Sequence, residues 1–287
     1  MRHGVHKCFI LSSRKHFTRF DILAAMGLRY RIHHHDTIDS TNDEARRLAS
    51  RGEPEGAVAA ADSQTAGRGR SGRAWITPPG AAIAMSIVLR PRVSANRTTQ
   101  IALLGGLAVL EGIRRVVDLP MQIKWPNDVL VRGKKVAGVL AEASFAGDKM
   151  EYVVLGIGVN VNDGPPPDSN LEYAATSLAT ESGSALDRES VMNAILSAFA
   201  ERYPLLGTPA LSALWSNHLA MRGQPVRVIG LAETIVGTLE SVTDEGAIVV
   251  RFDDGSSRTI LAGDVHLRGG PLSPALNNSP SPSKSSM

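Results

Sequence analysis

Apolar and polar positions alternate with two different periods along the first half of the chain. Alternation with a period of two predicts a strand over residues 30–38. The segment STNDEARRLASRG that follows places its alanines and leucine at helical spacing, and Thr41 and Glu44 have the separation of a capping box. The pattern therefore predicts a strand, a helix that begins near Thr41, strands over 56–61 and 83–89, and a long helix over 98–117.

The second half of the chain has a different pattern. Residues 122–162 consist of short apolar runs separated by the turn signals Arg132-Gly133 and Gly147-Asp148, which is typical of an antiparallel meander. A loop rich in Pro, Asp and Asn over 163–170 precedes helices near 188–203 and 209–219. We therefore expect an α+β fold with a mixed, largely antiparallel sheet and helices packed on it.

Composition divides the chain into four segments. From Gly223 onward, short strands and tight turns follow one another over about 45 residues, which predicts a small β-barrel domain. The tail lacks the apolar residues needed to fold. We expect an unstructured extension over 1–29, a core domain over 30–221, a β-domain over 222–269 and a disordered tail over 270–287.

Composition and charge exclude several classes of protein. The single cysteine, Cys8, excludes an internal disulfide, and no apolar run reaches the ~20 residues of a membrane span, so we expect a soluble protein in the reducing cytoplasm. Seven cations against Asp21 give residues 1–31 a net charge of +6. Because the whole chain carries +3, residues 32–287 sum to −3. A mildly acidic body argues against specific DNA binding.

The segment SQTAGRGRSGRAW, residues 63–75, contains the Gly-x-Gly-x-x-Gly spacing of a dinucleotide-binding loop. That function requires a helix after the last glycine, and Pro78-Pro79 stands too close for one to begin. What remains is a flexible backbone with Arg68, Arg70 and Arg73, whose guanidinium groups suit carboxylate and phosphate oxygens. We interpret it as an anion-binding loop; the alternative is a solvated surface loop.

Two segments after the long helix carry further candidate ligand-binding residues. In KWPND, Asp128 is a candidate ligand of Mg²⁺ beside a polyphosphate, although a Pro-Asn-Asp turn explains the same residues. Lys134 and Lys135 enter an apolar strand, where a lysine loses hydration and needs an anion. Gly138, three residues further on, lets a ligand approach the backbone.

Other patterns are less specific. Ser40-Thr41-Asn42 is explained by a helix start, although ligand oxygens also gather at helix N-termini. Gly156 and Gly158, followed by Asn160, leave room on a strand for a flat ligand or for a crossing segment. Histidines 33–35 alternate between the two faces of a strand and do not form a metal-ligand pattern.

Taken in order, the motifs DSTNDEA, SQTAGRGRSGRAW, KWPNDVLV, KKVAGVLAE and VLGIGVNVN resemble those of biotin protein ligases, and the small C-terminal β-domain fits that family. The resemblance covers about residues 30–268. It implies a class II synthetase-like ligase core followed by an SH3-like β-barrel. The first residues lack the pattern of the winged-helix DNA-binding domain found in bifunctional members of that family. We therefore expect the monofunctional form.

The resemblance assigns a role to each matching position. Ser40, Thr41, Asn42 and Gln64 fall where the family binds the biotin ring, and Arg68, Gly69 and Arg70 fall in its biotin and adenylate loop. Trp75 matches the aromatic residue that closes over the adenine, Asn127 and Asp128 the ATP and Mg²⁺ side, and Lys135 the lysine beside the biotin carboxylate. Gly138, Gly156 and Asn160 would line the pocket. Lys135, Arg70 and Asp128 are the catalytic candidates.

The implied activity is ATP-dependent biotinylation of one lysine on a biotin carboxyl carrier protein or domain, such as that of acetyl-CoA carboxylase, through biotinyl-5′-AMP. Biotin, ATP and Mg²⁺ are the implied ligands. We expect no membrane association and no specific DNA binding, and the family allows a homodimer. The alternatives are a lipoate-type protein ligase of the same superfamily and a biotin-sensing transcriptional regulator.

Overall fold

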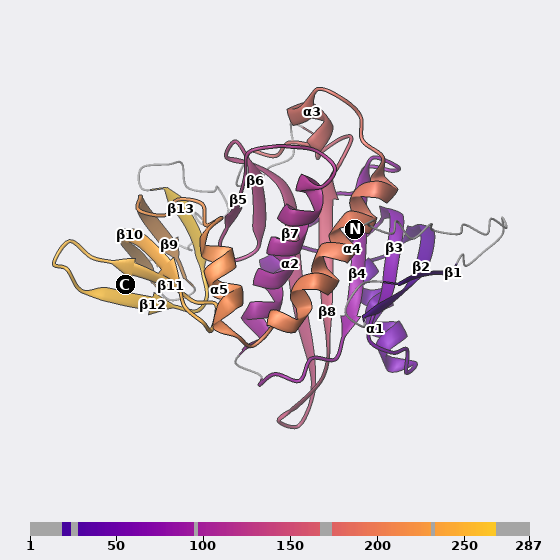
Figure 1. Ribbon diagram of the computed structural model, residues 1–287, viewed down its shortest axis with the longest axis horizontal. Coiled ribbons are helices and arrows are strands. Elements are labelled where there is room, and N and C mark those ends of the chain that lie inside the picture. Colours follow the sequence, from indigo (N-terminus) through magenta and orange to yellow (C-terminus); the bar gives the residue numbers. More distant parts are fainter. Residues whose placement is uncertain (1–18, 24–27, 95–96, 167–173, 231–232, 268–287) are drawn as a thin grey trace, which may run out of the picture.

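The computed structural model describes residues 19–23, 28–94, 97–166, 174–230 and 233–267 of the 287-residue chain. Two sheets organise these residues, a large one in the body and a small one at the C-terminal end (Figure 1). The expected disordered tail, the lone Cys8 and much of the loop expected over 163–170 lie outside the described residues.

The large sheet has the strand order β1-β2-β3-β4-β8-β7-β6-β5. Only the pair β2 and β3 is parallel, and every other neighbouring pair is antiparallel, which confirms the expected mixed, largely antiparallel sheet. The strands are β1 (Arg19–Leu23), β2 (Arg29–Ile38), β3 (Ala57–Gln64), β4 (Ala82–Leu89), β5 (Met121–Lys124), β6 (Asp128–Val131), β7 (Lys134–Ala146) and β8 (Lys149–Asn160).

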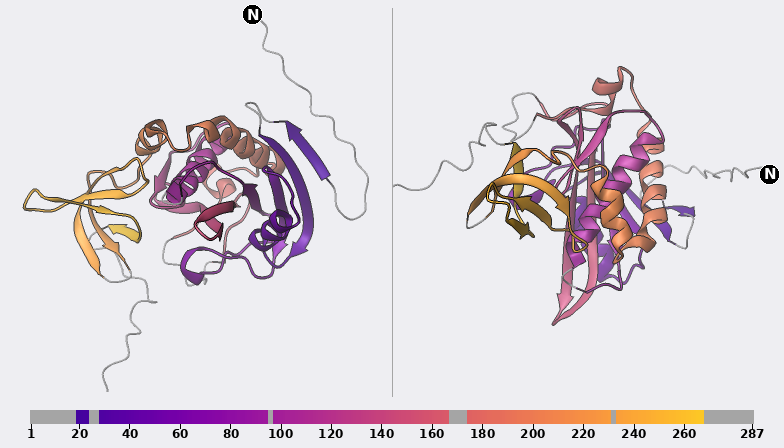
Figure 2. Two further views of the ribbon diagram at one scale, coloured as in Figure 1. Left: turned by 90° about the horizontal axis from the view of Figure 1, so that it is seen from below. Right: turned by 60° about the vertical axis from the view of Figure 1, so that its left-hand side comes forward.

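Helices cover both faces of this sheet (Figures 1 and 2). Side chains alternate between the faces of a strand. On β8, Leu155 and Ile157 belong to the main core beneath α2 and α4, whereas Val154 packs with α1 on the opposite face. The helices are α1 (Thr41–Ser50), α2 (Thr98–Arg114), the short α3 (Leu178–Ser182), α4 (Arg188–Arg202) and α5 (Pro209–Ser216).

The start of α1 differs from the expected capping box. Ser40, not Thr41, is the N-cap, and its side chain makes no capping hydrogen bond. Thr41 is the first helical residue, and its hydroxyl donates to Oε1 of Gln64, 3.1 Å away on β3. The capping-box prediction was wrong because a contact with a neighbouring strand engages the hydroxyl that the pattern assigned to the helix itself.

A strand occurs within the segment expected to be an unstructured extension. Arg19–Leu23 form β1, which pairs antiparallel with Arg29–His33 at the edge of the large sheet. Basic composition suggested a segment outside the fold. The exposed backbone groups of an edge strand can nevertheless pair with a short extended segment of almost any composition.

The small sheet contains β9 (Pro225–Ile229), β10 (Thr234–Val242), β11 (Ile248–Arg251), β12 (Ser257–Ile260) and β13 (Asp264–Leu267) in the order β12-β11-β10-β9-β13. Its apolar residues join the same hydrophobic core as the body. Trp125 Nε1 donates to the Gly246 carbonyl at 2.9 Å, and Ser212 Oγ donates to an oxygen of Asp244 at 2.6 Å. These contacts fix the small sheet against the body.

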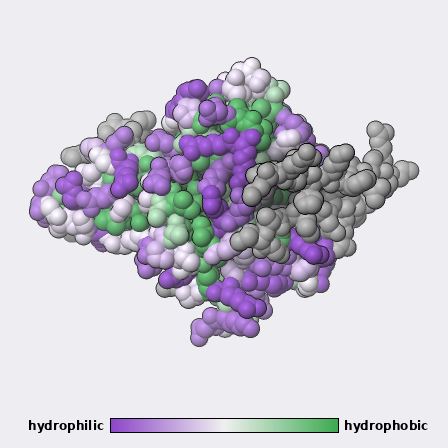
Figure 3. All heavy atoms as spheres, in the orientation of Figure 1, coloured by the Kyte–Doolittle hydropathy of each residue, from purple (hydrophilic) through white to green (hydrophobic). Residues whose placement is uncertain are grey.

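The surface is mixed in character. On the side of the molecule that carries α2 and α4, hydrophobic patches lie among hydrophilic residues (Figure 3). Across the described ranges, no helix combines the length and the apolar composition needed to cross a membrane.

Candidate functional site

A cavity of about 430 Å³ opens on the α1 side of the large sheet. Its floor consists of β7 and β8, and its wall consists of the start of α1, the end of β3 and the arginine loop, residues 63–75. Because β8 side chains alternate, Gly156, Gly158 and Asn160 face the cavity while Leu155 and Val159 face the core. The fold thereby brings segments more than 110 residues apart around one space.

Two glycines on β8 give the cavity its depth. A Cβ added to Gly156 would come within 2.2 Å of Asn42 Oδ1, and one added to Gly158 would come within 2.2 Å of the Trp75 ring. Contacts this short are excluded, so both side chains can lie against the strand only because these residues lack a Cβ. The close crossing expected from the Gly-x-Gly pattern involves Asn42 and Trp75.

Side chains at one end of the cavity form a connected polar group. Gln64 Oε1 accepts from the Thr41 backbone N–H at 2.8 Å, and Gln64 Nε2 donates to Thr77 Oγ1 at 3.1 Å. Ser86 Oγ on β4 lies 2.6 Å from Asn42 Oδ1 and is fully buried. These contacts fix the direction of each amide, so this end presents polar atoms in a set orientation.

Contacts on two sides hold the arginine loop. Arg68 donates through both terminal nitrogens to the carboxylate of Asp43 on α1, at 2.7 Å each. Arg70 lies 3.2 Å from Asp264 on β13, and Arg73 lies 2.8 Å from the other oxygen of the same carboxylate. The loop therefore connects the first helix of the body to the C-terminal sheet, across the mouth of the cavity.

Opposite charges meet in the middle of the cavity. Lys135 Nζ lies 2.6 Å from Oδ1 of Asp128 and 5.7 Å from the centre of the Trp75 ring. Asp128 is 8% exposed, and a carboxylate so deeply buried requires a cation or hydrogen-bond donors. Beside them, Asn127 Nδ2 donates to the Val139 carbonyl at 2.8 Å and Oδ1 accepts from Arg70 at 3.4 Å.

Three buried polar atoms of cavity residues have no hydrogen-bond partner among the described residues: Oδ1 of Asp128, Oδ1 of Asn160 and Nε1 of Trp75. Oδ1 of Asp128 is ion-paired with Lys135, whereas the other two have no such partner in the described part of the chain. The other end of the Asn160 amide donates to the Thr176 carbonyl at 3.0 Å, which fixes the orientation of the free oxygen. Because an unsatisfied buried polar atom is costly, one acceptor and one donor here suit a ligand that has both kinds of group.

Every site residue expected from the sequence lines this cavity: Ser40, Thr41, Asn42, Gln64, Arg68, Gly69, Arg70, Trp75, Asn127, Asp128, Lys135, Gly138, Gly156 and Asn160. Sequence reasoning missed Ser86, Asp264 and Glu142, a residue of β7 whose carboxylate accepts from Asn42 Nδ2 and lies 2.6 Å from Arg46. Ser86 had a signal, since it is the only polar residue within the apolar strand Ala82–Leu89. Asp264 is one of several acids in the small domain, and no feature of the sequence marked it as a site residue.

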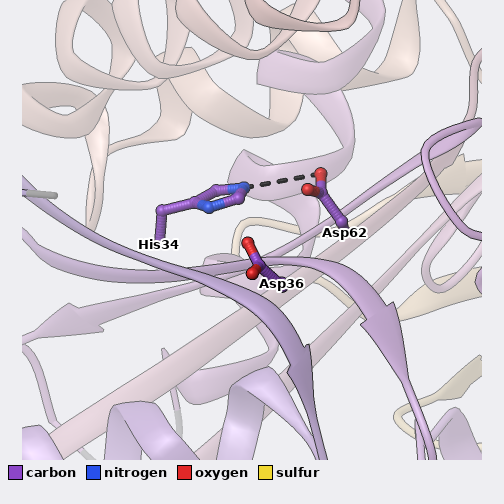
Figure 4. A group of neighbouring side chains, drawn as sticks. All are labelled: His34, Asp36 and Asp62. Carbon is purple, nitrogen blue, oxygen red and sulfur yellow. Dashed lines mark ion pairs between the residues drawn. The ribbon is translucent and has the colours of Figure 1, made fainter. Parts of the chain in front are cut away.

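A cluster of possible metal ligands lies on the other face of the sheet. His34, Asp36 and Asp62 bring their ligand atoms within 4.8 Å of one another, and His34 Nε2 points to Asp62 at 3.4 Å (Figure 4). Arg188 at the start of α4 donates to the same Asp62 oxygen at 2.8 Å. This arginine already supplies a positive charge to Asp62, so the arrangement is that of an ion-pair network.

Comparisons with known proteins agree with the geometry. Residues 35–160 match the sequence model of the biotin/lipoate A/B protein ligase family, and residues 223–268 match that of the biotin protein ligase C-terminal domain. The chain is 37% identical over 240 residues to the biotin–[acetyl-CoA-carboxylase] ligase of Paracoccus denitrificans, covering 80% of this chain and 98% of that one. It is also 37% identical to the bifunctional ligase/repressor BirA of Bacillus subtilis, covering 82% of this chain and 73% of the relative.

Among solved structures, the biotin protein ligase of Aquifex aeolicus in complex with biotin and ATP superposes with a TM-score of 0.71. The two sequences are 30% identical, and the superposition covers 83% of this chain and 98% of that one. The expected α+β core and C-terminal β-domain are thus confirmed. On these grounds the chain belongs to the biotin protein ligase family.

Proposed function

We propose that this protein uses ATP to activate biotin as biotinyl-5′-AMP and then transfers the biotinyl group to a lysine of a biotin carboxyl carrier protein or domain. The observation that carries the proposal is one cavity that joins a polar, preoriented end to a central group of cations. Biotin has a polar ureido ring at one end and a carboxylate at the other. The name of the Paracoccus relative points to the carrier of acetyl-CoA carboxylase.

The polar end of the cavity suits the ureido ring. Ser40, Thr41 and Asn42 are buried and lie beside Gln64. A ligand that lacks polar groups would leave this end unpaired, and such mismatches reduce affinity strongly. This argument favours biotin over lipoate, whose dithiolane ring would require an apolar slot.

The cations suit the first reaction. An oxygen of the biotin carboxylate attacks the α-phosphorus of ATP and pyrophosphate leaves, so two anionic groups must meet. Lys135, Arg68 and Arg70 line the space where they would meet. Bringing like charges together costs on the order of a few kcal/mol per pair at an effective dielectric constant near 20, and preoriented cations remove that cost.

Asp128 is the residue we assign to Mg²⁺. Magnesium on a polyphosphate takes one or two protein carboxylates, and Asp128 is a buried carboxylate beside Lys135 in the middle of the cavity. The other cavity carboxylate, Asp264, has an arginine on each of its two oxygens, whereas the ion pair of Asp128 with Lys135 engages Oδ1. The residues present therefore fit the ion, which would neutralise charge on the phosphates.

The adenine would lie near Trp75 and Asn160. The free Oδ1 of Asn160 can accept from an exocyclic amine, and the Trp75 ring, which lies over the glycines of the cavity floor, offers a flat surface for stacking. Asn127 stands between this region and Arg70. Gly138 lies opposite Gly158 in the sheet, and the absence of side chains at both positions makes room for the Trp75 ring on the floor of the cavity.

The second reaction requires no nucleophile from the enzyme. The amine of the carrier lysine attacks the carbonyl of the mixed anhydride, the bond to the phosphate oxygen breaks and AMP leaves with that electron pair. The arginine loop closes the mouth of the cavity, and its enzymatic role would be to keep water from the anhydride in the meantime.

Biotin-dependent exchange of labelled pyrophosphate into ATP tests the first reaction, and calorimetry with biotin and with lipoate tests the choice of acid. We expect exchange only with biotin and Mg²⁺, and heat of binding with biotin alone. Exchange driven by lipoate would make the protein a lipoate-type ligase.

The body of the chain does not favour a role as an operator-binding repressor, although the Bacillus relative is named a ligase/repressor. Residues 32–287 carry a net charge of −3, whereas DNA-binding domains present a basic face. Footprinting should show no protected pair of half-sites. The single Cys8 fits a cytoplasmic protein, where thiols stay reduced.

A further inference from the structure

We propose that Asp43 is a positioning residue, which acts through Arg68 to hold the arginine loop closed over the biotin end of the cavity. The inference rests on the proposed ligase function and adds to it a residue outside the cavity. Asp43 does not line the cavity, whereas Arg68 does. Any effect of Asp43 on the ligand must therefore pass through its partner.

The contact between the two side chains has the geometry of a strong ion pair. Nη1 and Nη2 of Arg68 lie 2.7 Å from Oδ2 and Oδ1 of Asp43. A two-bond pairing of this kind fixes the plane of the guanidinium as well as its position. Hydrogen bonding by Arg68 is the main cause that lowers the pKa of the Asp43 carboxyl, so Asp43 stays charged at neutral pH.

The loop has few other anchors on this side. Beyond Ala66, its backbone folds on itself as a small hairpin: Trp75 N–H donates to the Gly67 carbonyl at 2.9 Å, and Gly69 N–H donates to the Arg73 carbonyl at 2.7 Å. These bonds shape the hairpin without attaching it to the body. The Arg68 side chain makes that attachment to α1 through Asp43, next to Thr41 and Asn42 at the polar end. Its Nη2 also lies 3.9 Å from Oε2 of Glu142 on β7, too far for a hydrogen bond, so Asp43 is the closer acid.

The position of Asp43 in α1 determines what its loss should change. It follows Asn42 directly, so the helix turn that presents the polar end also carries the acid that holds the loop. Loss of the acid should leave the polar end intact and free the loop beside it. Biotin should then dissociate faster, and biotinyl-5′-AMP should escape before it meets a carrier.

A purely structural role for Asp43 predicts different behaviour. Asp43 also accepts from Arg46 at 2.7 Å within α1, and an acid in the first turn stabilises a helix by itself. Glu44 is the matched control, because it lies in the same turn with the same charge and pairs with Arg47 at 2.9 Å, away from the loop. Glu44→Gln repeats the loss of helix charge and leaves the Arg68 contact unchanged.

The experiment compares the full-length parent with Asp43→Asn, Asp43→Glu and Glu44→Gln. For Asp43→Asn we expect the KM for biotin in pyrophosphate exchange to rise about fivefold, as for loss of a partly exposed ion pair, with kcat changed much less. We also expect faster trypsin cleavage in the arginine loop and faster release of adenylate. Asp43→Glu, which keeps the carboxylate, and Glu44→Gln should behave as the parent.

A double variant identifies the route of the effect. On an Arg68→Ala background, Asp43→Asn should add nothing further to the KM for biotin, because the contact is already absent. The proposal is overturned if the two changes add fully, if Asp43→Glu is as impaired as Asp43→Asn, or if Asp43→Asn keeps the parent KM and trypsin resistance. A parent protein without biotin-dependent exchange would instead refute the proposed function, and the trypsin comparison would still test the loop contact.

Discussion

Lys135 Nζ lies 2.6 Å from Oδ1 of Asp128, and both side chains line the same cavity. The pair stands at the point where the polar end, the arginine loop and Trp75 meet. A lysine held by a buried acid has a fixed position. It can therefore stabilise an anionic transition state without reorganising first.

Lys135→Ala should slow the formation of biotinyl-5′-AMP. If Lys135 acts where charge gathers between the carboxylate and the α-phosphate, the loss should be about 10²- to 10³-fold in kcat, comparable to removal of other preorganised donors. Biotin-dependent pyrophosphate exchange measures this step alone. Transfer from preformed biotinyl-5′-AMP to a carrier should be much less affected, and a variant that exchanges pyrophosphate normally would contradict the assignment.

Arg70→Gly should separate the two half-reactions in the opposite way. Arg70 contacts Asp264 at 3.2 Å and Asn127 at 3.4 Å, so its loss removes one of the two arginine contacts that hold the loop to the C-terminal sheet and leaves only that of Arg73. Adenylate formation should continue, but the intermediate should leave the enzyme and label lysines on unrelated proteins. Addition of an excess of bystander protein followed by streptavidin blotting measures this, and labelling restricted to the carrier would refute the role of Arg70.

Gly158→Ala should impair ATP binding without unfolding the protein. Its Cβ would come within 2.2 Å of the Trp75 ring, which must move away from the strand. We expect the affinity for ATP to fall by more than about tenfold, a loss of ~1.4 kcal/mol or more. Calorimetry provides the measurement. Gly106→Ala in α2, where the nearest atom is 3.4 Å away, is the control, and equal affinities for all three proteins would contradict the account of Trp75.

Glu181 should contribute to stability in a pH-dependent way. It lies 2.7 Å from Arg132, whose hydrogen bond is the main cause that lowers the pKa of the Glu181 carboxyl below its usual 4.5. A lowered folded-state pKa means that the contribution is complete above pH 4.5 and is lost as the pH falls through the folded-state value.

Glu181→Gln should therefore be less stable than the parent at pH 7, by on the order of 1 kcal/mol because Arg132 is exposed to solvent. The difference should shrink as the pH falls below 4.5. Urea unfolding at pH 7 and at lower pH measures the gap, with the exposed Glu245→Gln as the control. A gap that stays constant with pH would show that the ion pair does not stabilise the fold.

Local pattern predicted most of the fold, because each element is encoded by its own residues. The strand expected over 30–38 is β2, Arg29–Ile38, and the helix expected over 98–117 is α2, Thr98–Arg114. The predictions that were wrong concern contacts between one element and another. The Thr41 hydroxyl bonds to Gln64 on another element, and Arg19–Leu23 depend on β2 for their pairing.

Prediction of the site from the sequence has the same limit, because contacts between separate elements were not foreseen. Motif residues such as Arg70 and Lys135 could be identified because their chemistry is unusual for their surroundings. The acids that hold them could not be, since Asp264 lies nearly 200 residues from Arg70 and only the packing of the C-terminal sheet brings them together. Asp43 is close to the motif in sequence, but its spacing is that of an ordinary acid in a first helical turn.

The central claim is tested most directly by incubating the protein with ATP, Mg²⁺, labelled biotin and a purified biotin-carrier domain, followed by mass spectrometry of the carrier. The account predicts that the carrier gains one biotinyl group on one lysine, that the gain requires ATP, and that AMP and pyrophosphate appear in equal amounts. A carrier that stays unmodified while the protein binds biotin and ATP would contradict it.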